Sequence, residues 1–444
     1  MAILTQAAQF ILSLSILIVL HELGHFIPAK LFKTRVEKFY LFFDPWFSLF
    51  KIKKGETEYG IGWLPLGGYV KISGMIDESM DKEQMAQPPQ PWEFRSKPAW
   101  QRLIVMLGGV TVNVILGVLI YWMVLFTWGE QHIPYKNLSK GFAIDSLGYK
   151  MGLRKGDSIL YVGTKPAVNI DRFSHDLLME DAQSILVLRD HKTVSLPITP
   201  EHLSTMISQK ITAVVEPNYP FHVDSVAPGT AAESAGLKKG DKIFAVNGAP
   251  TPYYQDVVNI IRGNKKLPVT VSILRDGKDT LQIKPVVSEE GTIGFAAKLE
   301  TDYLKVETTK YGIVESFPAS IHKAYSIFID NIKQFQLLFT IKDAHKQVGG
   351  FISIGKAYTP VWDWQHFWSI TALLSIVLAF MNILPIPALD GGHVMFLLYE
   401  VITRRKPNEK FLEYAQYVGM FILLALFLYA NGNDVIGLFK KYFG

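Results

Sequence analysis

Three residues near the start of the chain have the types and spacing of a metal-dependent hydrolytic site. His21, Glu22 and His25 form the pattern His-Glu-x-x-His. Residues i and i+4 share one face of an α-helix, so the two imidazoles can hold one metal ion while Glu22 lies beside them as a base. The pattern lies in an apolar stretch, residues 7–32, where buried His and Glu side chains are costly and usually functional. The alternative is a set of polar residues at a helix end that faces lipid headgroups.

A catalytic zinc site needs a third protein ligand and an open position for water. The chain has no cysteine, so that ligand must be a histidine or a carboxylate. Residues 382–393 read Asn-Ile-Leu-Pro-Ile-Pro-Ala-Leu-Asp-Gly-Gly-His at the end of another apolar stretch, where two prolines interrupt a helix. Asp390 is the expected third ligand, although an Asp-Gly pair also caps helices in water. His393 is a rival ligand and suits a supporting or capping role better.

The elements that must position these residues are membrane helices. The mean hydropathy of +0.18 is high for 444 residues, and four apolar stretches approach the roughly 20 residues that a spanning helix needs. We place them at residues 7–32, 103–128, 367–389 and 414–430. No basic residue precedes the first stretch, so we expect a retained helix and not a cleaved signal peptide. A formal net charge of +5, spread along the chain, argues against a nucleic-acid partner.

Orientation follows from the tendency of Lys and Arg to accumulate in short cytoplasmic loops. Basic residues are frequent between the first and second stretches and between the third and fourth, where Arg404, Arg405, Lys406 and Lys410 lie. We therefore expect both loops in the cytoplasm. Both termini and the long segment between the second and third stretches are then expected on the opposite side.

That long segment contains an internal repeat. Gly152-Leu-Arg-Lys-Gly-Asp-Ser-Ile159 recurs as Gly236-Leu-Lys-Lys-Gly-Asp-Lys-Ile243, an offset of 236 − 152 = 84 residues, about the size of one small β-rich domain. The repeated turn resembles that of PDZ domains, which bind extended peptides at a sheet edge. A duplicated spacer that binds nothing is the alternative. After the repeat, apolar residues recur every three or four positions from Phe317 to Phe339, which predicts an amphipathic helix at the membrane interface or packed on the second repeat.

The motifs around residues 21–25 and 382–393, with two PDZ-like repeats between them, resemble the site-2 protease family of intramembrane zinc metalloproteases. The resemblance covers essentially the whole chain. It implies that His21, His25 and Asp390 bind Zn²⁺ and that Glu22 is the catalytic base. It also implies that Asn382 holds substrate or the developing oxyanion.

Residues 59–71, which read Tyr-Gly-Ile-Gly-Trp-Leu-Pro-Leu-Gly-Gly-Tyr-Val-Lys, are similar to the membrane-re-entrant β-loop of that family. A spanning substrate is a helix, whereas peptide hydrolysis needs an extended backbone. A strand edge near the metal could receive the unwound segment, with Gly67, Gly68 and Tyr69 as expected substrate-binding residues. An ordinary cytoplasmic hairpin is the alternative.

Two segments depart from the family pattern. The family commonly has Gly-Pro-x-x-Asn in the second span, where this chain has Gly109-Val110-Thr111-Val112-Asn113, and a later Ser-Gly-Pro is here Gly349-Gly350-Phe351. We expect neither segment to contact the metal ligands, so the departures should affect helix packing and not the chemistry.

The predicted fold class is a multi-pass membrane protein with four transmembrane α-helices and a re-entrant β-loop, plus two tandem PDZ-like α/β domains. The predicted segments are the first transmembrane helix (1–34), a cytoplasmic region with the β-loop (35–102), the second transmembrane helix (103–130), PDZ-like domains at 131–215 and 216–300, an amphipathic helix region (301–345), and the third and fourth transmembrane helices (346–444).

The resemblance implies regulated intramembrane proteolysis in a bacterial inner membrane, with the PDZ-like domains on the periplasmic side. The implied substrates are single-span membrane proteins, such as an anti-sigma factor or remnant signal peptides, and the implied neighbours are membrane lipid and peptides at the PDZ-like domains. One alternative is a non-catalytic membrane scaffold with PDZ-like domains. Another is a metal-ion carrier, although carriers usually repeat their membrane helices and here only the soluble part is repeated.

Overall fold

The computed structural model describes residues 2–75, 87–180, 182–209, 211–299, 304–341 and 344–443. The other positions, among them residues 76–86 of the predicted 35–102 region, lie outside the described residues. The chain divides into two compact units. The first comprises Met1–Gly129, Lys310–Leu337 and Val348–Gly444, and the second comprises Glu130–Thr309 and Leu338–Gln347.

Four helices in the first unit are long and apolar enough to cross a membrane, which confirms the predicted number for the described residues. They are α1 (Ala2–Leu31), α3 (Ala99–Trp128), α11 (Trp364–Ile383) and α13 (Glu409–Phe443). The third ends at Ile383, six residues before the predicted end at position 389, because Pro385 and Pro387 have no backbone N–H to continue the helix. The chain then re-enters a helix, α12 (Asp390–Thr403), whose first residue is Asp390.

Helices α1 and α3 cross at a pair of glycines. A Cβ atom added to Gly24 would overlap the Gly108 carbonyl oxygen, and one added to Gly108 would overlap the Gly24 carbonyl oxygen. Small residues of this kind let helix backbones approach closely inside a membrane. Because Gly24 lies between Glu22 and His25, the crossing brings α3 directly against the metal-binding motif.

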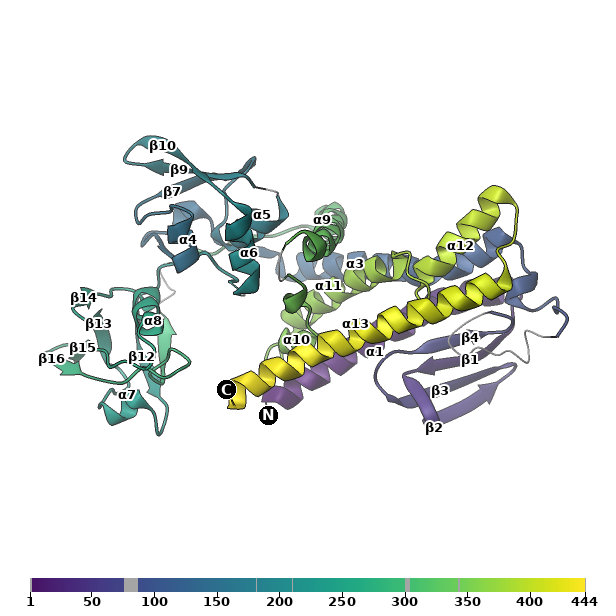
Figure 1. Cartoon of the computed structure of the whole chain (residues 1–444), viewed down its shortest axis with the longest axis horizontal. Helices are drawn as coiled ribbons and strands as arrows, with labels where there is room; N and C mark the ends of the chain where they lie inside the picture. The colour runs from purple at the N-terminus through teal and green to yellow at the C-terminus, as the bar shows by residue number, and fades with distance from the viewer. Residues whose placement is uncertain are drawn as a thin grey trace. The chain divides into compact units, whose positions relative to one another are not determined.

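A four-stranded sheet lies at the C-terminal end of α1 (Figure 1). Its order is β2-β3-β1-β4, formed by β1 (Val36–Leu41), β2 (Phe43–Lys54), β3 (Thr57–Leu64) and β4 (Tyr69–Ile72). β1 runs parallel to β3 and antiparallel to β4, with Tyr40 opposite Tyr69. β4 is therefore an edge strand of this sheet. The residue before it, Gly68, lies so close to α1 that an added Cβ would be 2.5 Å from Ile18 Cγ2.

The predicted amphipathic helix is α9 (Ile313–Thr340), which packs against α3 and α11. Trp122 of α3 donates a hydrogen bond to the Ile313 carbonyl (2.9 Å), and the rings of Phe328 and Phe380 lie 5.8 Å apart. The short helix α10 (Phe351–Lys356) is held by Asp434 of α13, whose carboxylate accepts hydrogen bonds from the backbone N–H groups of Gly350 and Ser353.

The second unit contains two halves with the same strand arrangement. The first half has sheet β10-β9-β7-β8 and the pair β6-β11, and the second has sheet β16-β15-β13-β14 and the pair β12-β17. The first half comprises β6 (Phe142–Ile144), α4 (Ser146–Lys150), β7 (Ser158–Val162), β8 (Lys165–Pro166), α5 (Phe173–Met179), β9 (Ser184–Arg189), β10 (Lys192–Pro197), α6 (Pro200–Ser208) and β11 (Val215–Pro217). The second comprises β12 (Phe221–Val226), α7 (Ala231–Ser234), β13 (Lys242–Val246), β14 (Ala249–Pro250), α8 (Tyr254–Gly263), β15 (Val271–Arg275), β16 (Asp279–Ile283) and β17 (Phe295–Leu299). A further pair joins β5 (Glu130–His132) to β18 (Glu307–Thr309).

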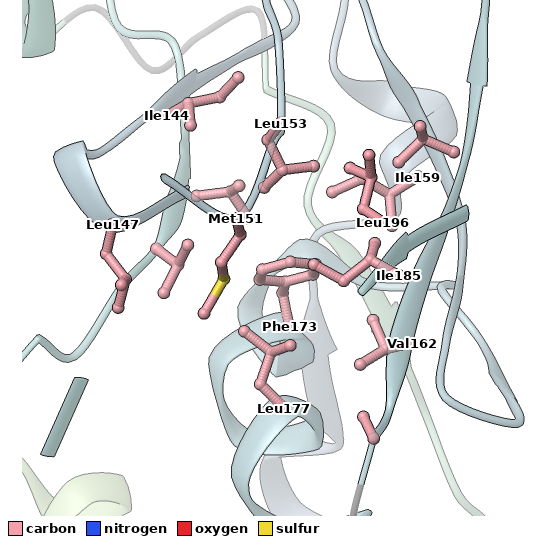
Figure 2. Packing of buried hydrophobic residues seen from close by; sticks show 14 of the residues in the cluster. Ile144, Leu147, Met151, Leu153, Ile159, Val162, Phe173, Leu177, Ile185 and Leu196 are labelled. Atoms are coloured by element: carbon pink, nitrogen blue, oxygen red, sulfur yellow. The ribbon is translucent and has the colours of Figure 1, made fainter. Parts of the chain in front are cut away.

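Each half has its own apolar core and repeats the same ion pair between a buried Asp and a partly exposed Arg. Figure 2 shows Phe173 and Leu177 of α5 pointing toward Met151 and the strand residues in the first half. Asp157 accepts two hydrogen bonds from Arg189 (2.7 and 2.8 Å). Asp241 accepts the equivalent pair from Arg275 in the second half (2.8 and 2.7 Å). In both turns the Asp also accepts the backbone N–H of the residue three positions before it, so the sequence repeat is a structural repeat.

Candidate metal centre

Two distant segments of the chain meet at the end of the loop that contains Pro385 and Pro387. His21 and His25 project from α1, and Asp390 is the first residue of α12. The two Nε2 atoms lie 3.3 Å apart, and each lies 3.4 Å from Asp390 Oδ2. Within the described residues, these three form the one cluster of at least three His, Cys, Asp or Glu side chains whose ligand atoms could hold a metal ion.

The dimensions of this cluster fit zinc. Tetrahedral zinc with bonds of about 2.0–2.1 Å places neighbouring ligand atoms roughly 3.3 Å apart, which matches all three sides of the triangle. Asp390 Oδ2 is buried and, apart from the two imidazole nitrogens, has no hydrogen-bond partner among the described residues. A buried carboxylate oxygen without donors is costly, and a cation removes that cost.

Helix α3 contacts both histidines, contrary to the expectation that residues 109–113 lie clear of the metal ligands. His25 Nδ1 is 2.8 Å from the Val105 carbonyl oxygen, and His21 Nδ1 is 3.1 Å from the Asn113 side-chain amide. A Cβ atom added to Gly109 would be 2.8 Å from His21 Nδ1 and would overlap His25 Nε2. The physical reason is the glycine crossing of α1 and α3. The segment that lacks the family proline thus forms one wall of the site.

A cavity of about 630 Å³ opens beside the cluster. Glu22 lines it together with the three ligand residues, with Gly68 and with Tyr69, the first residue of β4. An added Cβ on Gly68 would lie 3.7 Å from Glu22 Cγ, so the edge strand passes directly beside this carboxylate. The cavity thus gives an extended peptide room next to both the metal ligands and a proton acceptor.

The other predicted residues lie near the same cavity. Asn382, in the last turn of α11, has its side-chain nitrogen 3.3 Å from His21 Nε2. Tyr69 donates a hydrogen bond to Asp44 (2.9 Å), which holds its ring at the cavity wall. Gly67 lies against the Phe43 ring. His393, the rival ligand, lines the cavity without joining the ligand triangle.

Gln416 of α13 is a buried residue of the site that the sequence reasoning missed. Its Oε1 accepts a hydrogen bond from the backbone N–H of Ala388 (3.2 Å), two residues before Asp390. Ala388 has φ +77°, a backbone conformation that is strained for a residue with a side chain. The hydrogen bond therefore helps to hold the loop that delivers Asp390. A single polar residue inside an apolar span was the available sequence signal.

Comparison with known proteins adds the family. Residues 9–426 match the profile of Peptidase family M50. The chain belongs to this family. A Vibrio cholerae serotype O1 protein whose name describes a zinc metalloprotease is 30% identical, with 97% of this chain and 98% of that protein covered. The Regulator of sigma E protease of Haemophilus influenzae is 27% identical (99% and 100% covered), and Protease RseP of Yersinia pestis is 28% identical (98% and 99%).

The M50 assignment confirms the predicted resemblance to the site-2 proteases. This M50 protein is an intramembrane zinc metalloprotease and a multi-pass membrane protein. The assignment favours the enzyme over the non-catalytic scaffold.

Proposed function

We propose that His21, His25 and Asp390 hold the catalytic zinc of this protease and that Glu22 transfers the protons of peptide hydrolysis. The ligand triangle, with sides of 3.3, 3.4 and 3.4 Å, is the observation that carries this proposal. When bound, zinc supplies a Lewis acid that makes water acidic and polarises a carbonyl group.

Glu22 accepts a proton from the attacking water, whose oxygen forms a bond to the scissile carbonyl carbon. Glu22 then gives that proton to the amine nitrogen as the carbon–nitrogen bond breaks, so the carboxylate is regenerated. Asn382 donates a side-chain N–H to the developing oxyanion, a role supported by its position at the edge of the ligand triangle. Gly109 and the crossing at Gly24 keep the imidazoles in place.

We propose further that the substrate binds as an added strand on β4, which makes Gly67, Gly68 and Tyr69 the substrate-binding residues. β4 is the sheet edge beside Glu22, and an edge strand offers unpaired backbone groups to an extended peptide. The sheet is the re-entrant β-loop of the protein in this proposal. Strongly exposed apolar side chains on β2, such as Trp46, Leu49 and Phe50, support contact with lipid.

The two halves of the second unit are proposed to be tandem PDZ-like domains, near residues 131–215 and 216–300, on the periplasmic side of a bacterial inner membrane. The repeated topology and the basic loops on the other side of the spans support this arrangement. The name of the Haemophilus relative, Regulator of sigma E protease, supports a role in sigma-factor regulation. For this role we propose a single-span anti-sigma factor, or remnant signal peptides, as substrates in regulated intramembrane proteolysis. In this role the PDZ-like domains exclude substrates that have not been trimmed, or bind peptides.

The ligand assignment is tested with full-length protein purified in detergent, by its zinc content and its cleavage of a single-span model substrate. Glu22→Gln should keep one zinc per chain and lose cleavage, Asp390→Ala should lose zinc, and the His393→Gln control should keep it. Zinc retained in Asp390→Ala but lost in His393→Gln would overturn the assignment. Cleavage by Glu22→Gln at the wild-type rate would overturn the role of the glutamate.

The filter role has its own test. Deleting residues 135–300 while keeping the spans should permit cleavage of an untrimmed substrate that the full chain leaves intact. Unchanged selectivity would contradict the filter.

A further inference from the structure

We infer that Asn113 is a positioning residue of the metal centre, which accepts the Nδ1–H of His21 through its side-chain carbonyl oxygen. The inference rests on the proposed role of His21 as a ligand. It assigns Asn113 the task of selecting one tautomer of that imidazole.

Asn113 is fully buried and is fixed on both its backbone and its side chain. Its exposed fraction is 0%, and its side-chain amide lies 3.1 Å from His21 Nδ1. Ser375 of α11 donates a hydrogen bond to the Asn113 backbone carbonyl (2.7 Å). The side chain is therefore held at the imidazole by contacts between three helices.

The tautomer of His21 determines which amide atom must face it. A neutral imidazole has one N–H donor and one acceptor nitrogen, so a ring that binds metal through Nε2 carries its proton on Nδ1. An amide NH₂ group facing that N–H would place two donors together. In the structure Asn113 Nδ2 faces the ring, while its Oδ1 is buried and has no hydrogen-bond partner among the residues that the structure describes. The oxygen and nitrogen of a carboxamide are assigned from their hydrogen-bond partners. Turning the Asn113 amide by half a turn places its oxygen opposite the Nδ1–H of His21, which then has an acceptor.

His25 provides an internal parallel. Its Nδ1 lies 2.8 Å from the Val105 carbonyl oxygen, an acceptor that leaves Nε2 free to bind metal. Val105, Gly109 and Asn113 are spaced by four residues and so follow one face of α3. This face offers an acceptor to each histidine, and Gly109 leaves room between them for both rings. Outer hydrogen bonds of this kind orient metal-binding histidines, and their loss typically reduces metal affinity about 10- to 100-fold.

The experiment measures zinc affinity by competition with a chromophoric chelator, using full-length protein in detergent. Asn113→Leu removes the acceptor at similar volume and should weaken zinc binding about 10- to 100-fold. Asn113→Asp keeps an acceptor oxygen and should bind zinc at least as tightly as the unmodified protein. Thr371→Val is the matched control, because Thr371 is equally buried in the bundle but hydrogen-bonds to Ser13 (3.0 Å). Its zinc affinity should not change.

A packing role for Asn113 predicts the opposite order, because an apolar Leu would suit the bundle and a charged Asp would not. Unchanged zinc affinity in Asn113→Leu would therefore overturn the inference, as would an Asn113→Asp protein that binds zinc as weakly as Asn113→Leu. If Asn113→Leu does not fold, Asn113→Asp decides alone, and a loss of tenfold or more overturns the inference.

His21→Ala separates this inference from the proposed function. Zinc lost in His21→Ala but kept in Asn113→Leu would overturn only the role of Asn113. Zinc kept at full affinity in His21→Ala would overturn the proposed ligand set as well.

Discussion

Gly109→Ala places one methyl group between α3 and both metal-binding imidazoles. The added Cβ would lie 2.5 Å from His21 Cε1 and 2.8 Å from His21 Nδ1, and it would overlap His25 Nε2. Favourable contacts between non-bonded heavy atoms begin at about 3.5 Å. The rings or the helix must therefore move by roughly 1 Å, which exceeds the ~0.5 Å within which a functional site must be held.

Overpacking of this kind typically costs about 1–3 kcal/mol. The cost falls on the zinc-bound form, because there the rings must also keep the ligand geometry. Since 1.4 kcal/mol corresponds to a tenfold change in an equilibrium constant, the expected loss of zinc affinity is about 5- to 150-fold. Cleavage at limiting zinc should fall in parallel.

The assay is chelator competition on purified full-length protein, with Gly117→Ala as the control. Gly117 lies on the same helix, but its added Cβ would meet the flexible end of the Ile376 side chain, 2.5 Å from Cδ1. The control should therefore alter thermal stability without altering zinc affinity. Equal zinc affinity in Gly109→Ala and Gly117→Ala would refute the claim that α3 forms a wall of the metal centre.

Three further predictions concern other parts of the molecule. Burial would raise the pKa of Asp157, but its hydrogen bonds and ion pair with Arg189 hold the pKa below its ordinary value of 3.8. The ionised carboxylate therefore stabilises the folded state at neutral pH, and this stabilisation is lost as the pH falls through the lowered pKa. Asp157→Asn should therefore destabilise the first half of the repeat by roughly 1.5–3 kcal/mol at pH 7, the usual contribution of hydrogen bonds to a charged group. Unchanged hydrogen exchange in β7 and β9 would contradict this. Gly68→Ala brings a methyl group 2.5 Å from Ile18 Cγ2 and 2.7 Å from the Tyr40 carbonyl oxygen, so β4 should shift. We expect kcat/KM to fall while the zinc content stays unchanged. A wild-type kcat/KM would argue against strand addition at β4. Removing zinc with a chelator should abolish cleavage and re-addition should restore it, and full activity in metal-free protein would exclude a catalytic metal.

The three proposed metal ligands could be chosen from the sequence because each carries a local signature. The i, i+4 spacing of His21 and His25 and the acidic residue after two prolines are readable without knowing how the helices pack. The four spans and the duplicated turn follow equally from length and periodicity. Their ends were less predictable, since α11 ends at Ile383 where the first proline stops it, although the apolar composition continues.

The role of α3 was not predictable from an all-apolar span. The residues of this helix are apolar on all of its faces, so the sequence does not indicate which face meets α1. In the structure α3 crosses α1 at Gly24 and Gly108, and this crossing places Gly109 and Asn113 beside the imidazoles. Gln416 was missed for a related reason, because its partner is a backbone N–H in a loop whose conformation the sequence does not specify.

Zinc K-edge X-ray absorption of the full-length Glu22→Gln protein, loaded with one equivalent of zinc, tests the central claim most directly. The account predicts two imidazole nitrogens and at least one carboxylate oxygen at about 2.0–2.1 Å, and loss of this coordination shell in Asp390→Ala. A shell with fewer than two imidazoles, or one that Asp390→Ala leaves unchanged, would contradict it.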